Sequence, residues 1–142
     1  LEFFGVDQRH ESDIEGLGRI PAEQQMKSTK VPSFNVIGNS PLVLRESLLD
    51  EVYTMGENFV EAAKRVVSPG MNGPFCIEGV YDENAKFTSF EFSARIVAGT
   101  NIYMDGSPYY SLLFNENMSM GKRIAREVKI AEEKNEIEKI VT

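Results

Sequence analysis

Residues 74–96 read PFCIEGVYDENAKFTSFEFSARI, and this stretch decides the fold class. Two runs rich in aromatic and β-branched residues, 74–81 and 86–96, lie on either side of the polar segment Asp82-Glu83-Asn84-Ala85. Two such runs joined by a tight turn are typical of an antiparallel β-hairpin. We therefore expect a hairpin here and place the other elements around it.

The register of this hairpin follows from its turn. If Tyr81 faces Lys86, then Ile77 faces Phe90, and these positions fall on one apolar face. Successive side chains of a strand point to opposite faces, so Glu78 and Glu91 share the other face. This register makes the two glutamates diagonal neighbours, about 7–8 Å apart at the backbone.

Two carboxylates on one face repel each other, and a cation between them would remove that cost. Magnesium takes oxygen ligands and is commonly held by one or two carboxylates together with substrate phosphates. The same pattern also fits an ordinary half-buried hairpin with a polar outer face. Spacing alone leaves both interpretations open.

The remaining elements are expected from hydrophobic spacing, helix caps and chain breakers. They are a strand over 1–8, a loop over 14–20, a short helix over 22–27 after Pro21, a strand over 33–38 ended by a tight turn at Gly38-Asn39-Ser40-Pro41, and helices over 47–67, capped by Ser47, and 119–134. The expected fold is one α+β domain, in which an antiparallel sheet containing the hairpin is packed by the last two helices.

Composition limits the function. The net charge of −7 argues against a nucleic-acid partner, since the phosphate backbone is met by an excess of lysine and arginine. Cys76 and His10 are single, so this chain builds no disulfide framework and no zinc site alone. The single cysteine fits a reducing cytoplasm, and we expect a soluble protein because no stretch is long and apolar enough for a membrane span. Leu1 replaces an initiator Met, and we interpret it as an interior position of a longer chain.

A family resemblance bears on the two glutamates. A glutamate on each strand, the second in the frame Glu91-Phe92-Ser93-Ala94-Arg95, resembles the metal-binding end of the ATP-grasp superfamily. Most members carry Asn where this chain carries Ser93, and a hydroxyl is a weaker oxygen donor than an amide carbonyl.

A narrower resemblance covers nearly the whole chain. The chain resembles the archaeal formate-dependent synthetases that make 5-formaminoimidazole-4-carboxamide ribonucleotide (FAICAR), in the stretches LEFFGVDQRHES, VIGNSPLVLRESLL, SPGMNGPFC, FEFSARIVAGTN, GSPYYSLLF and MSMGKRIAREVKIA. The resemblance implies the C-terminal, metal-binding part of an ATP-grasp ligase whose N-terminal half lies outside this chain. The implied reaction joins formate to the amine of 5-aminoimidazole-4-carboxamide ribonucleotide (AICAR) in purine biosynthesis, through formyl phosphate, with release of ADP and phosphate.

The resemblance also implies roles for single residues. Glu78 and Glu91 would bind Mg²⁺, or Mn²⁺ in its place, Glu11 would contact ATP, and Asn39 would contact AICAR. On its own, Glu11 is typical of a surface carboxylate and Asn39 of a structural turn. Arg95 follows the second glutamate by four residues, and we hypothesise that it stabilises a transferring phosphoryl or formyl phosphate oxygen. The implied partners are ATP, formate, AICAR, the chain's own N-terminal half and further copies in a homo-oligomer.

Two alternatives remain open from the sequence. One keeps ATP-grasp carboxylate–amine ligation and changes the substrate, because no residue identifies formate directly. The other is a non-catalytic module that uses the acidic hairpin face and the final helix for subunit assembly.

Overall fold

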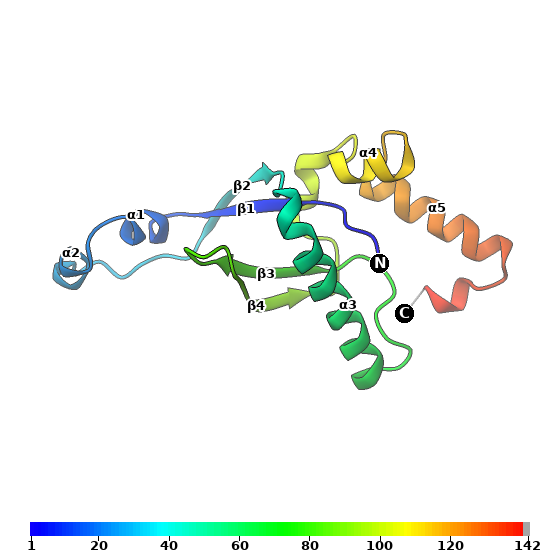
Figure 1. The fold of residues 1–142 in the computed structure, drawn as a ribbon, viewed down its shortest axis with the longest axis horizontal. Coiled ribbons are helices and arrows are strands. Elements are labelled where there is room, and N and C mark those ends of the chain that lie inside the picture. Colours follow the sequence, from blue (N-terminus) through cyan, green and yellow to red (C-terminus); the bar gives the residue numbers. More distant parts are fainter. Residues whose placement is uncertain (141–142) are drawn as a thin grey trace.

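The structure is a computed structural model that describes residues 1–140. The elongated molecule contains both helices and antiparallel strands (Figure 1), which confirms the α+β class. The strands are β1 (Val6–Glu11), β2 (Val36–Leu42), β3 (Cys76–Tyr81) and β4 (Phe87–Ser93). The helices are α1 (Ile14–Gly18), α2 (Ala22–Lys27), α3 (Leu49–Val66), α4 (Pro108–Phe114) and α5 (Met120–Glu133), with 3₁₀ turns η1 (Glu46–Leu48), η2 (Ala98–Tyr103) and η3 (Ile137–Lys139).

The strands form two separate antiparallel pairs, β1 with β2 and β3 with β4. As expected, α3 packs on the β3–β4 hairpin: the ring of Phe59 lies 4.7 Å from that of Phe75 and 5.0 Å from that of Phe92. The expectation that α5 also packs on the hairpin is wrong. α5 lies beside α4 at the other end of the molecule (Figure 1), where Arg126 stacks over the ring of Phe114 at 5.6 Å.

The hairpin exists, but its predicted register is wrong. Tyr81 pairs with Phe87 instead of Lys86, because the turn contains residues 82–86 and is one residue longer than the expected turn over 82–85. The register then shifts between Glu78 and Gly79, which leaves Phe90 as the extra residue of a β-bulge. As a result Glu78 pairs directly with Glu91.

Residues 38–41 were expected to form a turn, and the structure places them inside β2. The ladder runs from Val6 opposite Leu42 to His10 opposite Gly38, so the backbone of β1 supplies partners throughout. Both strands of a two-stranded sheet are edge strands, and an edge strand can contain proline on the side that makes no ladder hydrogen bond. Pro41 is therefore compatible with β2.

Two other expected bounds are also wrong. The first strand starts at Val6 and not at residue 1, since Phe3 and Phe4 leave the ladder to pack on aromatic rings. The expected loop over 14–20 contains the short helix α1.

The three predicted helices are confirmed. α5 begins where expected, with the Ser119 hydroxyl accepting a hydrogen bond from the Lys122 amide at 3.2 Å. α3 is preceded by η1, so Ser47 lies within that turn and does not cap the helix. α4 was not predicted, although Ser107 caps it and Pro108 is its first residue, a common helix start.

Aromatic rings join the start of the chain to η2 and α4. Phe3 packs on Tyr109 at 4.6 Å, and Phe4 packs edge-on against Tyr110 at 4.8 Å and Tyr103 at 5.7 Å. The Tyr103 hydroxyl lies 2.5 Å from the Val6 carbonyl oxygen and 3.3 Å from that of Leu42, the two residues paired at one end of the β1–β2 ladder. Tyr103 therefore ties η2 to both strands.

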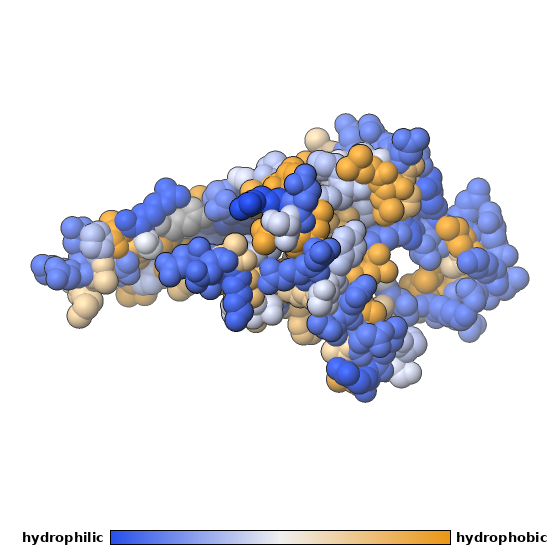
Figure 2. Space-filling view, in the orientation of Figure 1, coloured by the Kyte–Doolittle hydropathy of each residue, from blue (hydrophilic) through white to orange (hydrophobic). Residues whose placement is uncertain are grey.

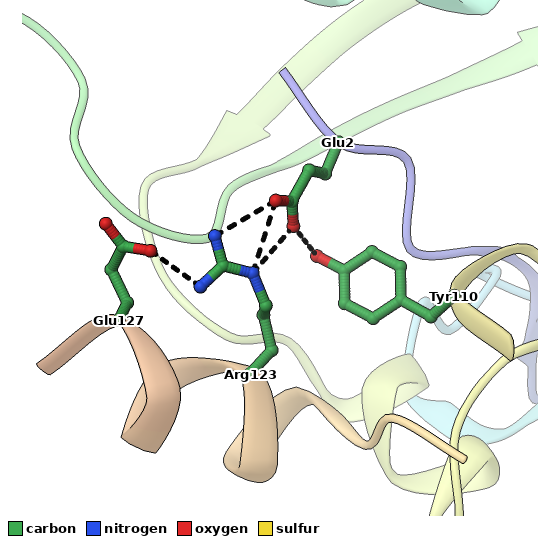
Figure 3. Close-up of polar contacts among 4 residues, drawn as sticks. All are labelled: Glu2, Tyr110, Arg123 and Glu127. Carbon is green, nitrogen blue, oxygen red and sulfur yellow. Dashed lines mark hydrogen bonds and ion pairs between the residues drawn. The ribbon is translucent and has the colours of Figure 1, made fainter. Parts of the chain in front are cut away.

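A network of charges, which we call the Glu2 clamp, fastens the start of the chain to the helical end (Figure 3). Arg123 donates from Nε and Nη2 to the two carboxylate oxygens of Glu2, at 2.9 Å each. The Tyr110 hydroxyl donates to Glu2 at 3.0 Å, and Glu127 receives the remaining Arg123 contact at 2.7 Å. The guanidinium of Arg123 lowers the pKa of Glu2, and burial raises the pKa of Tyr110.

Much apolar surface stays uncovered. Among residues 1–140 the buried hydrophobic side chains are Tyr110, Met118 and Ala131. Figure 2 shows apolar patches on the surface, one of them over α4, where Leu112 is 82 % exposed. None of the helices described in residues 1–140 has the length and apolar character needed to span a membrane.

Candidate active site

The β1 strand and the β3–β4 hairpin meet through Arg9. Its guanidinium lies 2.6 Å from the Glu78 carboxylate on β3 and 3.0 Å from the Glu11 carboxylate at the end of β1. The register of the β1–β2 ladder also shifts at this end of β1, between His10 and Glu11. Arg9 thus joins the predicted ATP-contacting residue to a predicted metal ligand.

Glu78 and Glu91 make the acidic pair. They face each other directly in the ladder, and residues paired in this way have Cβ atoms about 4.5–5.5 Å apart on one face of the sheet. The Glu78 side chain is 22 % exposed and is engaged by Arg9. Glu91 is exposed and forms no hydrogen bond or ion pair with the described residues. One carboxylate is therefore balanced by a cation and the other is available to a ligand.

These two carboxylates suit Mg²⁺ or Mn²⁺ as a partial ligand set. Both supply hard oxygen donors, and magnesium needs only one or two of them when phosphates supply the rest. Among the side chains that the structure describes, no three from His, Cys, Asp or Glu gather closely enough to enclose a metal ion. Further ligands would be phosphate oxygens, water, amide, hydroxyl or backbone oxygens, or groups from outside this chain.

Asn39 lies on β2, directly opposite Arg9 in the ladder. Its amide nitrogen donates a hydrogen bond to the Asp7 carboxylate at 2.5 Å. Asp7 and Arg9 are alternate residues of β1 and share one face of the strand. Asn39 is therefore held within the same polar group as Arg9, and not in an isolated turn.

Burial and the neighbouring charges shift the pKa of the Cys76 thiol. Burial, followed by the Glu78 and Asp7 carboxylates, raises its pKa to about 11, while Arg9 and Arg95 act in the opposite direction. A thiol of such a pKa stays protonated near neutral pH, so Cys76 is a poor nucleophile.

Arg95 does not lie on a strand, although the second run of the expected hairpin, 86–96, includes it. β4 ends at Ser93, and the Arg95 guanidinium donates to the carbonyl of Ile96 at 2.9 Å in the bend that follows. Its charge still acts on Cys76. The proposed contact with a phosphoryl oxygen stays a prediction.

The structure gathers Glu11, Asn39, Glu78 and Glu91 on elements that are neighbours in space. Sequence reasoning missed the two residues that connect them, Asp7 and Arg9. A signal was present, because Asp7, Arg9 and Glu11 alternate as residues of a strand face do.

A hollow lies between α3 and the β3–β4 hairpin. It has a volume of about 820 Å³ and is lined by α3 and β4, including Phe59, Phe90 and Phe92. Its walls are mainly aromatic and acidic, with no basic group to meet a phosphate, although Glu91 also contributes to them. The charge arrangement around Arg9 therefore identifies the candidate site better than the size of the hollow does.

Comparison with known proteins defines the family. The whole chain, residues 1–142, matches the family described as "Domain of unknown function (DUF1297)", and the chain belongs to this family. Proteins named 5-formaminoimidazole-4-carboxamide-1-(beta)-D-ribofuranosyl 5'-monophosphate synthetase are similar to it: one from Nitrosopumilus maritimus is 88 % identical over 142 residues, and one from Archaeoglobus fulgidus is 50 % identical over 141 residues.

A solved structure has the same fold. The IMP biosynthesis protein PurP from Thermococcus kodakaraensis matches 99 % of this chain with a TM-score of 0.78 and 34 % sequence identity. The match covers 44 % of that chain, and the two synthetases above are covered to 42 % and 39 %. This chain thus spans about two fifths of the length of its relatives. That it corresponds to their C-terminal part stays a prediction.

Proposed function

We propose that this chain is part of an ATP- and formate-dependent ligase that formylates AICAR to FAICAR in purine biosynthesis. The observation that carries the proposal is the Arg9 bridge, which joins Glu11 to Glu78 while Asn39 lies opposite Arg9. The names of the similar synthetases support the substrate, and the remainder of the polypeptide would supply the rest of the site. The finer fold assignment, an ATP-grasp ligase, is part of the same proposal.

The chemistry explains why acidic and basic groups meet here. A formate oxygen attacks the γ-phosphorus of ATP, the bond to the ADP oxygen breaks, and formyl phosphate forms. The AICAR amine then attacks the formyl carbon, the bond to phosphate breaks, and the amine loses a proton. Two anions must approach each other in the first step, so positive charge at the phosphates lowers its barrier.

Glu78 and Glu91 would hold Mg²⁺ or Mn²⁺, which would supply such charge at the phosphate oxygens. Arg9 already engages Glu78, so it would share this carboxylate with the metal ion or move toward a phosphate. Glu11, fixed by Arg9, offers acceptor oxygens to a ribose hydroxyl or the adenine amine. This chain's own contribution is thus to bind and orient ATP from one side.

Release of ADP by the complete polypeptide tests the proposal. We expect ADP only when Mg²⁺, AICAR and formate are all present. Glu78→Gln and Glu91→Gln should each reduce turnover by about 10²-fold or more, because each removes charge where a metal ligand is needed. Glu83→Gln, in the exposed hairpin turn, is the matched control and should keep full activity.

Each component of the proposal has its own contradicting result. Full activity in both glutamine variants would overturn the metal assignment. ADP release with another acid or amine, and none with formate and AICAR, would favour a ligase of different substrate. A complete polypeptide that neither binds nor hydrolyses ATP would favour an assembly module.

A further inference from the structure

We infer that Asp7 is a positioning residue that fixes the side-chain amide of Asn39, so that Asn39 presents its carbonyl oxygen to an N–H donor of the substrate. The inference rests on the proposed function, which gives Asn39 the contact with AICAR. It adds a residue, Asp7, a direction for the hydrogen bond and the kind of substrate atom that is recognised.

Asp7 and Asn39 lie diagonally across the β1–β2 ladder, since Asn39 pairs with Arg9 and Asp7 pairs with Pro41. Asn39 Nδ2 lies 2.5 Å from Asp7 Oδ2, and both residues are half-buried. A hydrogen bond between a neutral amide and a carboxylate is stronger than one between two neutral groups. The contact therefore holds the Asn39 side chain firmly in one orientation.

The chemistry of the pair decides which way the amide points. An ionised carboxylate only accepts hydrogen bonds, so the group of Asn39 that faces Asp7 must be its NH₂ and not its oxygen. The carbonyl oxygen is then directed away from Asp7. A free amide can turn either end to a ligand, whereas this one offers mainly an acceptor.

Asp7 itself is held by close packing. A Cβ atom added at Gly99 would lie 2.1 Å from Asp7 Oδ1 and 2.2 Å from its Cγ, so the carboxylate occupies space that only glycine leaves free. Gly99 is buried in η2, and Tyr103 of the same turn bonds to the β1 carbonyl of Val6. The backbone of η2 thus sets the position of Asp7, and Asp7 sets that of Asn39.

The fitting ligand group is a hydrogen-bond donor, and the nitrogens of AICAR that carry hydrogen can supply one. AICAR has two of them, its exocyclic amine and its carboxamide NH₂, and ATP binding does not require this contact. Disturbing Asp7 should therefore weaken AICAR binding selectively.

The test measures AICAR binding by calorimetry and the KM values for AICAR and ATP in the complete polypeptide. Asp7→Asn should raise the Kd and KM for AICAR about tenfold, the effect of one oriented hydrogen bond, and leave the KM for ATP unchanged. Asn39→Asp should do the same, because two carboxylates then face each other. The exchanged pair Asp7→Asn with Asn39→Asp restores an amide donor facing a carboxylate, and should recover most of the lost affinity.

Gly99→Ala provides an independent arm, since it displaces Asp7 without changing either polar residue. It should mimic Asp7→Asn in KM for AICAR, and Gly121→Ala, where an added Cβ meets nothing within 4 Å, is the matched control. Wild-type Kd for AICAR in Asp7→Asn, an equal rise in both KM values, or no recovery in the exchanged pair would overturn the inference alone. A wild-type polypeptide that does not bind AICAR would overturn the proposed function and the inference with it.

Discussion

Glu2 connects the start of the chain to α4 and α5, and its ionisation makes that connection dependent on pH. Because the Arg123 guanidinium lowers the pKa of Glu2 in the folded state, folding is favoured by loss of the Glu2 proton. This contribution is fully present above the ordinary carboxyl pKa of 4.5 and disappears as pH falls through the lower pKa of the folded state.

Glu2→Gln should therefore lower the free energy of unfolding at neutral pH by about 1 kcal/mol, with the difference from wild type vanishing in acid. Urea denaturation at a series of pH values measures this. Glu127→Gln removes only the more exposed partner of Arg123 and should have the smaller effect. A Glu2→Gln deficit that stays constant into acid would show that charge is not the cause.

Arg95 provides a second residue-scale prediction. If its guanidinium stabilises a phosphoryl oxygen during transfer, Arg95→Ala should reduce kcat about 10²-fold while leaving the KM for AICAR nearly unchanged. Arg65→Ala, at the exposed end of α3, is the control. Unchanged turnover in Arg95→Ala would leave Arg95 as a residue that only braces the bend through Ile96.

At this scale the sequence predicted the charged residues Glu11, Glu78 and Glu91 of the candidate site, and it missed Asp7 and Arg9, which connect the site residues. Glu78 and Glu91 were correctly placed on one face because two register differences cancel: the longer turn shifts the pairing by one residue, and the bulge at Phe90 shifts it by one more. The alternation of Asp7 with Arg9 and Glu11 was a local signal, but the contact that fixes Asp7 is with Gly99, 92 positions further along the chain. No local pattern contains a contact of that separation.

Among the elements, α5 allows the clearest prediction. The Ser119 hydroxyl satisfies the otherwise unpaired amide of Lys122 in the first helical turn. Ser119→Ala should lower the free energy of unfolding by about 1 kcal/mol, and Ser119→Asp, which caps equally well, should not. Equal losses in the two variants, followed by circular dichroism during urea denaturation, would contradict a capping role.

The elements were predicted well where one face of a helix repeats, as in α3 and α5, and poorly where strands carry irregularities. A bulge at Phe90 shifts the hairpin pairing by one residue, and hydrophobic alternation does not reveal which residue is extra. Gly79 fits that bulge, since a Cβ there would lie 2.4 Å from the Thr88 carbonyl oxygen. In β2, pairing with β1 outweighs the turn preference of Gly38-Asn39-Ser40-Pro41.

At the scale of the whole molecule, uncovered apolar surface is the dominant property. Val36 and Ile37 of β2, Phe90 and Phe92 of β4, and Leu112 of α4 are all more than half exposed. Residues of this kind in contiguous patches mark surfaces that bind other protein. The relatives contain more than twice this length of chain, which provides enough protein to cover such surfaces.

The isolated 142-residue chain should therefore bind a hydrophobic dye more strongly, mole for mole, than the complete polypeptide does. Fluorescence titration measures the difference, and a Phe90→Ser with Phe92→Ser variant of the isolated chain should reduce it. Equal dye binding by the isolated chain and the complete polypeptide would mean that these patches stay open to water.

The Tyr103 hydroxyl gives the β1–β2 ladder two unequal ends. It reaches the carbonyls of Val6 and Leu42 at one end, while the register shift at His10 and Glu11 interrupts pairing at the other. Opening should therefore begin at the bulged end and stop at the tyrosine, so backbone amides near Glu11 exchange with deuterium before those near Val6. The β1–β2 ladder would thus open near Glu11 while it stays paired beside Asp7.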